Sequence, residues 1–165
     1  MNAAVLRPRP GQTMTLRPLT LGLLDELLAI EREAYEFPWT RGNFVDSIAA
    51  GYLGRALIGD DDRAMRAYLV AMVGVQEMHL LNLTVAPAWQ RCGIGSALLD
   101  ELVQQCRERR AGQLWLEVRA SNAGARALYE RYGFRHIGMR RGYYPAAGGR
   151  REDALVMGYK IDGLV

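Results

Sequence analysis

The sequence is poor in the residues that build disulfide frameworks and metal centres. Its 165 residues include two cysteines and two histidines. Cys92 and Cys106 form no Cys-x-x-Cys pair, and His79 and His136 are isolated along the chain. Disulfide frameworks and zinc sites need clusters of these residue types. We therefore expect neither a structural disulfide nor a bound metal.

Long apolar segments are absent as well. The longest apolar run, around residues 68–75, falls well short of the roughly 20 residues that span a bilayer. The first ten residues carry two arginines and two prolines, where a secretory signal would have an apolar stretch. These absences predict a cytoplasmic protein that does not associate with membranes.

Lysine is nearly missing, because 20 of the 21 basic residues are arginine. The net charge of +3 is uneven: residues 1–90 carry −2 and residues 91–165 carry +5. This excess favours an anionic ligand on the C-terminal half, although codon usage alone would also produce many arginines. No long basic run or interleaved aromatic patch is present, so we expect no direct nucleic-acid binding.

The hydrophobic pattern predicts a layered α/β (α+β) domain. Residues 1–13 contain two prolines and a glycine and are expected to be a flexible leader, followed by a single domain over residues 14–165. Apolar spacing and turn residues then predict an alternation of strands and helices with at least one parallel crossover. Strands are expected over 15–18, 52–58, 65–75, 79–85, 114–118, 134–139 and 154–159, and helices over 21–35, 40–50, 94–109 and 122–132.

A glycine segment, Gln90–Gly95, separates a predicted strand from the longest predicted helix. Glycines let several backbone N–H groups point into one concavity, and a helix N-terminus adds partial positive charge, which together suit a phosphate or pyrophosphate. No Gly-Lys-Ser/Thr follows, which excludes an NTPase P-loop, and the third glycine of a Rossmann fingerprint would fall at Leu98. A tight strand-to-helix turn without a ligand is the alternative reading.

In this order of elements, Gln-x-x-Gly-x-Gly resembles the acetyl-CoA-binding motif of the GNAT superfamily of N-acetyltransferases. Other segments are similar to its RimI-type branch, and the similarity extends over about residues 15–160: Phe37-Pro38-Trp39, Trp115–Asn122, Ala127–Glu130, Gly133-Phe134, Arg140–Pro145 and Arg151–Ala154. The resemblance implies a central mixed, mostly antiparallel sheet made of the seven expected strands, with splayed central parallel strands and flanked by the four expected helices.

This resemblance also implies an activity. The branch acetylates the N-terminal alanine of ribosomal small-subunit protein S-eighteen, which implies acetyl-CoA as cosubstrate, a ribosomal N-terminal peptide as partner, and a monomer or weak dimer. A broader protein N-terminal or small-amine acetyltransferase is one alternative. A non-catalytic CoA-binding partner is another, although such a protein has no use for an acid and a base at the thioester.

The chemistry of the acceptor agrees with an α-amine. A protein α-amino group has a pKa near 7.7–8.0, so roughly a tenth is already neutral at pH 7. A lysine side chain near 10.4 would need about 2.5 further units, or roughly 3.4 kcal/mol, to lose its proton. A modest base is therefore sufficient for an α-amine acceptor.

Two residues are candidates for acid–base catalysis. Alternation along residues 114–118 points Glu117 away from its neighbours' face, and the resemblance assigns it the role of base. An ion pair with Arg119 or a neighbouring arginine is the alternative role, and Glu77 is a rival base. Tyr129 lies two helical turns after Asn122, and the resemblance makes its phenol the acid that protonates the leaving thiolate, with core packing as the alternative.

The resemblance assigns cofactor contacts to Leu83, Thr84, Val85, Arg91, Cys92, Gly93, Ile94, Gly95, Ser96 and Asn122. In the first three residues the main chain is the expected partner, because a pantetheine arm pairs like an added strand. Asn122 would cap its helix in either case. Phe37, Trp39, Tyr143 and Tyr144 are expected to wall a peptide cleft from aromatic loops, or simply to pack. Cys92, Thr84 and the longer loop at residues 148–150 depart from the family pattern.

Overall fold

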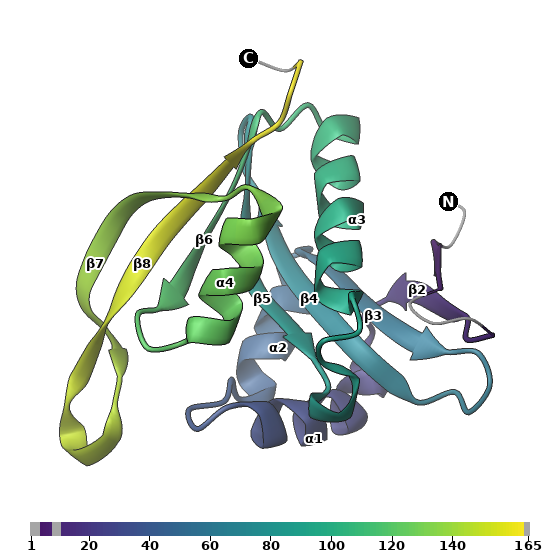
Figure 1. The fold of residues 1–165 in the computed structure, drawn as a ribbon. Helices are drawn as coiled ribbons and strands as arrows, with labels where there is room; N and C mark the ends of the chain where they lie inside the picture. The colour runs from purple at the N-terminus through teal and green to yellow at the C-terminus, as the bar shows by residue number, and fades with distance from the viewer. Residues whose placement is uncertain (1–3, 8–10, 164–165) are drawn as a thin grey trace. The chain divides into compact units, whose positions relative to one another are not determined.

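Four α-helices and eight strands make up residues 4–7 and 11–163, the part of the chain that the computed structural model describes (Figure 1). These residues group into two compact units. The first contains the described residues up to Met72 together with Asn82–Glu101, and the second contains Val73–Leu81 together with the described residues from Leu102 onward. One domain over residues 14–165 therefore stays a prediction.

The predicted elements are confirmed with small shifts at their ends. The strands are β1 Val5–Leu6, β2 Met14–Pro18, β3 Leu53–Gly59, β4 Met65–Val73, β5 Glu77–Val85, β6 Gln113–Arg119, β7 Arg135–Pro145 and β8 Arg151–Lys160. The helices are α1 Leu24–Ala34, α2 Arg41–Ala49, α3 Ile94–Glu108 and α4 Ala123–Tyr132, with short 3-10 turns at Leu21–Leu23, Pro87–Trp89 and Ala147–Gly149.

In the first unit, strands β1 to β4 are joined in chain order by antiparallel pairing. Strand β1 was not predicted: Val5 lies opposite Thr15 and Leu6 opposite Met14. Part of the expected leader is therefore held by backbone hydrogen bonds, and residues 1–3 and 8–10 of that leader lie outside the described residues.

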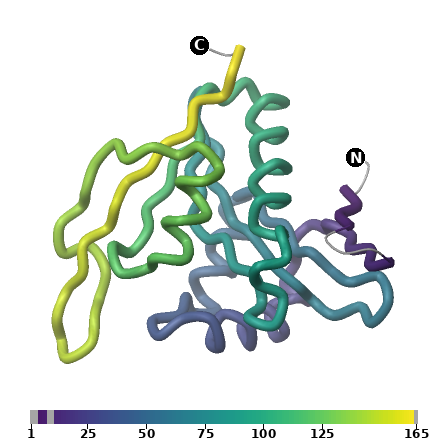
Figure 2. Tube along the Cα trace, viewed as in Figure 1, coloured from purple at the N-terminus to yellow at the C-terminus, as the bar shows by residue number. Residues whose placement is uncertain are grey.

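In the second unit the order is β5-β6-β8-β7, and the two long strands β7 and β8 run side by side (Figures 1 and 2). The pairs β6–β8 and β8–β7 are antiparallel, whereas β5–β6 is parallel. The parallel register takes in Glu77–Leu80 against Gln113–Leu116, the first four residues of each strand, which agrees with the predicted splaying. The mixed, mostly antiparallel α/β (α+β) fold is thus confirmed.

One prediction about the second unit is wrong. Tyr143-Tyr144-Pro145 was expected in a loop but lies inside β7, with Tyr144 opposite Glu152. The register shifts between Arg140 and Tyr144, and Gly142 adopts φ +56 within this irregularity. A bulge with a glycine in the left-handed region bends a strand without ending it. The two tyrosines are consequently held on a strand.

Local helix signals behave as expected. The side chain of Thr40 accepts a hydrogen bond from the Asn43 N–H, and the Asn43 side-chain oxygen accepts one from the Thr40 N–H, which is a complete capping box. Asn122 caps α4 by accepting from the Ala125 N–H at 3.2 Å. Along α3 the predicted stripe of Ile94, Leu98, Leu102 and Cys106 is buried, with each residue at most 1% exposed.

The core of the first unit encloses a carboxylate. Glu31 on α1 is 1% exposed, and its two oxygens accept from the Tyr68 hydroxyl at 2.7 Å and from the Asn82 amide at 2.9 Å. The amide oxygen of Asn82 accepts from the Thr84 hydroxyl at 2.7 Å, and that hydroxyl lies 2.7 Å from the Tyr35 hydroxyl. This Glu31 network connects α1 to β4 and β5 within the unit, because a buried polar group needs partners.

Burial raises the pKa of Glu31 above its ordinary 4.5, against the opposing effect of its hydrogen bonds from Tyr68 and Asn82. The folded chain therefore binds this proton more tightly than the unfolded chain does, so the contribution of Glu31 to stability declines as pH rises from about 4.5 through the raised value. Glu31→Gln removes the titration. We expect its free energy of unfolding, relative to wild type, to increase across this window in urea unfolding experiments.

The control for this prediction is Glu33→Gln, an exposed position on the same helix. Its stability should follow the wild-type pH curve. Equal pH curves for wild type and Glu31→Gln would contradict the raised pKa of Glu31.

Candidate functional site

In the first unit the predicted phosphate loop connects β5 to α3. Arg91 and Gly93 adopt left-handed backbone angles, φ +58 and φ +83, and the Gln90 side chain donates to the Val85 carbonyl at 3.1 Å. A non-glycine residue in this region is strained by about 1 kcal/mol or more, and such strain gathers at functional sites. The two left-handed residues lead the chain into the start of α3. The first N–H groups of this helix have no partner within it and suit an anion.

The three cofactor candidates on β5 precede this loop. Thr84 is 2% exposed, while Leu83 and Val85 on the other face of the strand are less buried. The Thr84 hydroxyl belongs to the Glu31 network, which gives this buried polar side chain a hydrogen-bond partner. The Leu83 carbonyl accepts from the Tyr35 hydroxyl at 3.3 Å. Side chains of the first unit thus hold the backbone of this strand.

The two predicted aromatic residues before α2 differ in their surroundings. The Trp39 ring lies 5.1 Å from Phe44, whose ring in turn packs edge-on against Tyr68 at 5.9 Å. Trp39 therefore packs, as its alternative reading had it. Phe37 is 37% exposed and is the better placed of the two to meet a ligand.

In the second unit, Glu117 lies where alternation predicted. Leu114, Leu116 and Val118 are buried on one face of β6, and Glu117 is on the other, with 6% of its side chain exposed. Its Oε1 lies 3.2 Å from His79 Nε2, and its Oε2 lies 3.5 Å from Arg140 Nε. A carboxylate that is largely shielded from water, and that lies between a histidine and an arginine, is positioned to accept a proton.

Of the alternative partners that the sequence suggested for Glu117, a neighbouring arginine, Arg140, lies beside it, whereas Arg119 has its own ion pair. Arg119 donates to Glu152 at 3.0 Å and to the Pro145 carbonyl at 2.7 Å, and its guanidinium lies 4.5 Å from the centre of the Tyr144 ring. These contacts connect β6 to the far ends of β7 and β8.

Tyr143 and Tyr144 accompany Glu117 in the same unit, with their rings edge to face at 5.0 Å. Burial, and then the charge of Glu117, raises the pKa of Tyr144 to about 12. Burial and the Glu117 carboxylate also raise the pKa of Tyr143. Both phenols therefore stay neutral and polar beside the carboxylate at neutral pH.

Sequence reasoning missed His79. It treated the histidine as isolated, because only the register of β5 and β6 brings His79 opposite Trp115 and close to Glu117. Arg140 was noted only as part of a motif. The available signal was a histidine on one predicted strand and a candidate base on another. The sequence does not say which strands pair.

Glu77, the rival base, is the exposed first residue of β5, opposite Gln113. Gln113 precedes Glu117 by four residues on β6, so on the order of 13 Å of strand separates Glu77 from the level of Glu117. The geometry of the second unit favours Glu117.

Helix α4 carries the remaining candidates. Asn122 uses its side-chain oxygen as the helix cap. Tyr129 is 7% exposed, and its ring packs against Phe134 at 5.5 Å. Tyr129 therefore packs in the protein interior, and its role as an acid remains a prediction.

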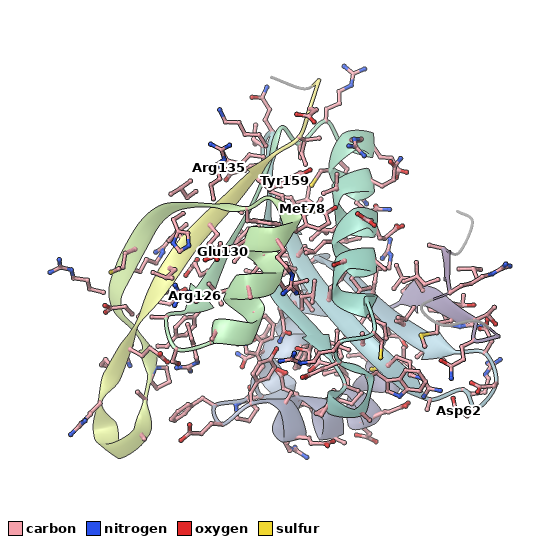
Figure 3. All side chains as sticks on the ribbon, in the orientation of Figure 1. Asp62, Met78, Arg126, Glu130, Arg135 and Tyr159 are labelled. Carbon is pink, nitrogen blue, oxygen red and sulfur yellow. The ribbon has the colours of Figure 1, made fainter. Side chains whose placement is uncertain are left out.

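Among residues 4–7 and 11–163, no group of three or more His, Cys, Asp or Glu residues could hold a metal ion. Neither Cys92 nor Cys106 is in a disulfide, and Cys106 Sγ lies 3.8 Å from the sulfur of Met78, which Figure 3 labels. Within the same described residues, no helix combines the length and apolar character needed to span a membrane.

Comparison with known proteins agrees with this geometry. Residues 24–134 match the acetyltransferase (GNAT) family. The chain is 42% identical over 132 residues to the [ribosomal protein bS18]-alanine N-acetyltransferase of Escherichia coli K12, covering 80% of this chain and 87% of the relative. The corresponding protein of Haemophilus influenzae is 37% identical over 133 residues, covering 81% and 89%. The crystal structure of the Escherichia coli ribosomal-protein-S18-alanine N-acetyltransferase superimposes with a TM-score of 0.80 at 40% identity, covering 90% of this chain and 94% of that one.

The loop before α3 can be tested at Gly95, the second residue of that helix. Gly95→Asp places a carboxylate where a pyrophosphate is expected, and we expect calorimetry to show a large loss of CoA affinity. The helix itself should tolerate the change, because acidic residues stabilise a helix N-terminus.

The matched control is Gly42→Asp, at the second residue of α2, where a Cβ would meet only the Thr40 hydroxyl at an ordinary 3.6 Å. This variant should bind CoA as wild type does. Unchanged CoA affinity in a folded Gly95→Asp variant would remove the phosphate site from this loop.

Proposed function

Because the chain belongs to the acetyltransferase (GNAT) family, we propose that it transfers acetyl from acetyl-CoA to the N-terminal alanine α-amine of ribosomal protein bS18. The main support is the buried Glu117 carboxylate in a chain that is 42% identical, over most of its length, to a curated enzyme of this activity. A cytoplasmic location and a monomer or weak dimer belong to the same proposal.

Acetyl-CoA is proposed to bind through the first unit's loop and strand. The strained loop at Arg91 and Gly93 and the following helix N-terminus suit the pyrophosphate. The backbone of Leu83, Thr84 and Val85 is proposed to pair with the pantetheine arm as an added strand would. No bound metal is needed, because a thioester is already activated for attack by an amine.

The base is proposed to be Glu117. The acceptor arrives largely as an ammonium ion, and its proton passes to the Glu117 carboxylate, directly or through water. The neutral nitrogen then attacks the thioester carbonyl. A C–N bond forms and the C–S bond breaks, the nitrogen loses its second proton to water as the amide forms, and the CoA sulfur leaves as a thiolate.

The acid is proposed to be Tyr129, whose phenol gives its proton to the thiolate. The peptide is proposed to meet aromatic side chains, namely Phe37, Trp39, Tyr143 and Tyr144. Because Tyr143 and Tyr144 lie on a strand, they form a stiffer wall than a loop would. The longer turn at residues 148–150 is the position at which peptide preference could differ from that of the relatives.

The acceptor preference is a first test. We expect a higher kcat/KM for a peptide with the N-terminus of bS18 than for free lysine, a polyamine or an aminoglycoside, because an α-amine reaches its neutral form more easily. The same peptide with a blocked N-terminus and a free lysine is the control. Faster turnover of any small amine than of the bS18 peptide would contradict the proposal.

The catalytic pair is a second test. Glu117→Gln should slow the reaction mainly below the pKa of the acceptor amine, and the rate should recover as pH rises and the amine deprotonates in solution. Tyr129→Phe should lower kcat by about 10²–10⁴-fold at every pH, because hydroxide does not replace a missing acid. Rates measured from pH 6 to 9 with the bS18 peptide distinguish the two.

Two variants on α4 serve as controls for this pair. Glu130→Gln and Tyr132→Phe make the same chemical changes at residues outside the proposed machinery, and both should keep wild-type kcat. CoA affinity should be nearly intact in all four variants. A pH–rate profile of Glu117→Gln parallel to wild type would move the base elsewhere, and a normal kcat for Tyr129→Phe would leave that residue with packing alone.

A further inference from the structure

The two histidines of the chain each lie beside a glutamate, but in different surroundings. His136 Nε2 is 3.0 Å from Glu130, which projects from α4 (Figure 3), and both side chains are nearly half exposed, at 45% and 48%. His79 Nε2 is 3.2 Å from Glu117, and these side chains are 14% and 6% exposed. An exposed pair of this kind contributes little to stability. In a pair shielded from water, each side chain depends on the other for its hydrogen bond.

The His79 ring is held in place. It stacks on the Trp115 indole with the ring centres 3.6 Å apart and the planes within 10° of parallel. The parallel register places His79 opposite Trp115, and Glu117 follows two residues later on the same face of β6. Backbone pairing and ring stacking together therefore aim Nε2 at the carboxylate.

The direction of this hydrogen bond follows from its chemistry. An ionised carboxylate only accepts, so Nε2 must carry the hydrogen. Burial lowers the pKa of His79, although the Glu117 charge opposes that shift, and the ring is neutral at neutral pH. Oε1 of Glu117 is thus engaged by a neutral donor. Oε2 is buried and has no hydrogen bond of ordinary geometry to another described residue, with Arg140 Nε at 3.5 Å.

The charged and titratable groups around this pair come from three strands. Glu77 acts on His79 from β5 itself, Glu117 from β6, and Arg140 from β7. Tyr143, also on β7, faces the Glu117 carboxylate with its neutral phenol. The Arg140 guanidinium already lies beside Oε2, and the neutral histidine adds no further charge. The contribution of His79 is to orient the Glu117 carboxylate through the hydrogen bond to Oε1.

We propose that His79 is a positioning residue for Glu117: stacked on Trp115, it occupies Oε1 with its Nε2–H and leaves Oε2 as the oxygen that accepts the amine proton. This inference rests on the proposed function, since it concerns the base of that reaction. It predicts that His79 acts on the rate only through Glu117.

Kinetics of three variants test this role. His79→Phe keeps an aromatic ring for stacking but loses the donor, and we expect kcat to fall about 10- to 100-fold, the range for losing one hydrogen bond to a charged group, with little change in the KM for acetyl-CoA. His79→Gln offers a donor again and should recover part of this loss. His136→Phe, the matched control, should keep wild-type kcat.

A double variant shows whether the effect passes through the carboxylate. In a Glu117→Gln background, His79→Phe should lower kcat no further, because coupled residues are not additive. A full additional loss in that background would overturn the inference, as would wild-type kcat in a folded His79→Phe variant.

Imidazole NMR of the ¹⁵N-labelled protein provides a readout that does not need activity. With two histidines in the chain, each ring gives resolvable signals. We expect His79 as the neutral Nε2–H tautomer, and Glu117→Gln should lower its pKa further by removing the carboxylate that favours the imidazolium. Glu130→Gln should change only the His136 signals. An Nδ1–H tautomer, or a His79 titration insensitive to Glu117→Gln, would overturn the inference.

These results also separate the inference from the proposed function. If Glu117→Gln is slow while His79→Phe is fully active, only the positioning role fails. If Glu117→Gln keeps wild-type kcat, the base lies elsewhere and the inference fails, whereas acetyl transfer to bS18 is decided by the acceptor test alone.

Discussion

Two buried carboxylates, Glu31 and Glu117, need hydrogen-bond donors, and strand β5 supplies one to each. Asn82 donates to Glu31 in the first unit, and His79 donates to Glu117 in the second. An unpaired charge away from water is costly, so each carboxylate constrains the strand that partners it. At positions 82 and 79, strand β5 therefore needs side chains that can donate a hydrogen bond.

The two carboxylates differ in how fully they are satisfied, and that difference separates structure from chemistry. Glu31 has a donor on each oxygen, and its network reaches Thr84 and Tyr35. Glu117 has neutral donors in His79 and Tyr143, but its Oε2 has no hydrogen bond to another described residue and only an arginine at a longer distance. Environment assigns roles to otherwise identical side chains, and the less satisfied carboxylate is the better candidate base.

The bulge in β7 has a comparable effect on the aromatic residues. Because Gly142 lets the strand continue past its irregularity, Tyr144 is paired with Glu152 of β8, Tyr143 directly precedes it, and both lie near Glu117. Arg151 donates to the Gly142 and Tyr143 carbonyls at 2.9 Å each, which holds the backbone on both sides of the turn. Side chains held on such a strand are already ordered, so a peptide that bound there would require less ordering than one that bound to a loop.

Local signals in the sequence determined the four helices, their caps at Thr40 and Asn122, the glycine loop before α3 and the orientation of Glu117 on its strand, because each depends on residues a few positions apart. The pairing of β5 with β6 was decided only in the tertiary structure, and with it the contact between His79 and Glu117. Those residues lie 38 positions apart in the sequence, and no local pattern encodes which strands become neighbours. The same holds for Glu31, whose helical spacing suggested an ordinary position on α1, whereas its two donors come from β4 and β5. Burial and hydrogen bonding between distant segments, which give a side chain its chemistry, exist only once the chain has folded.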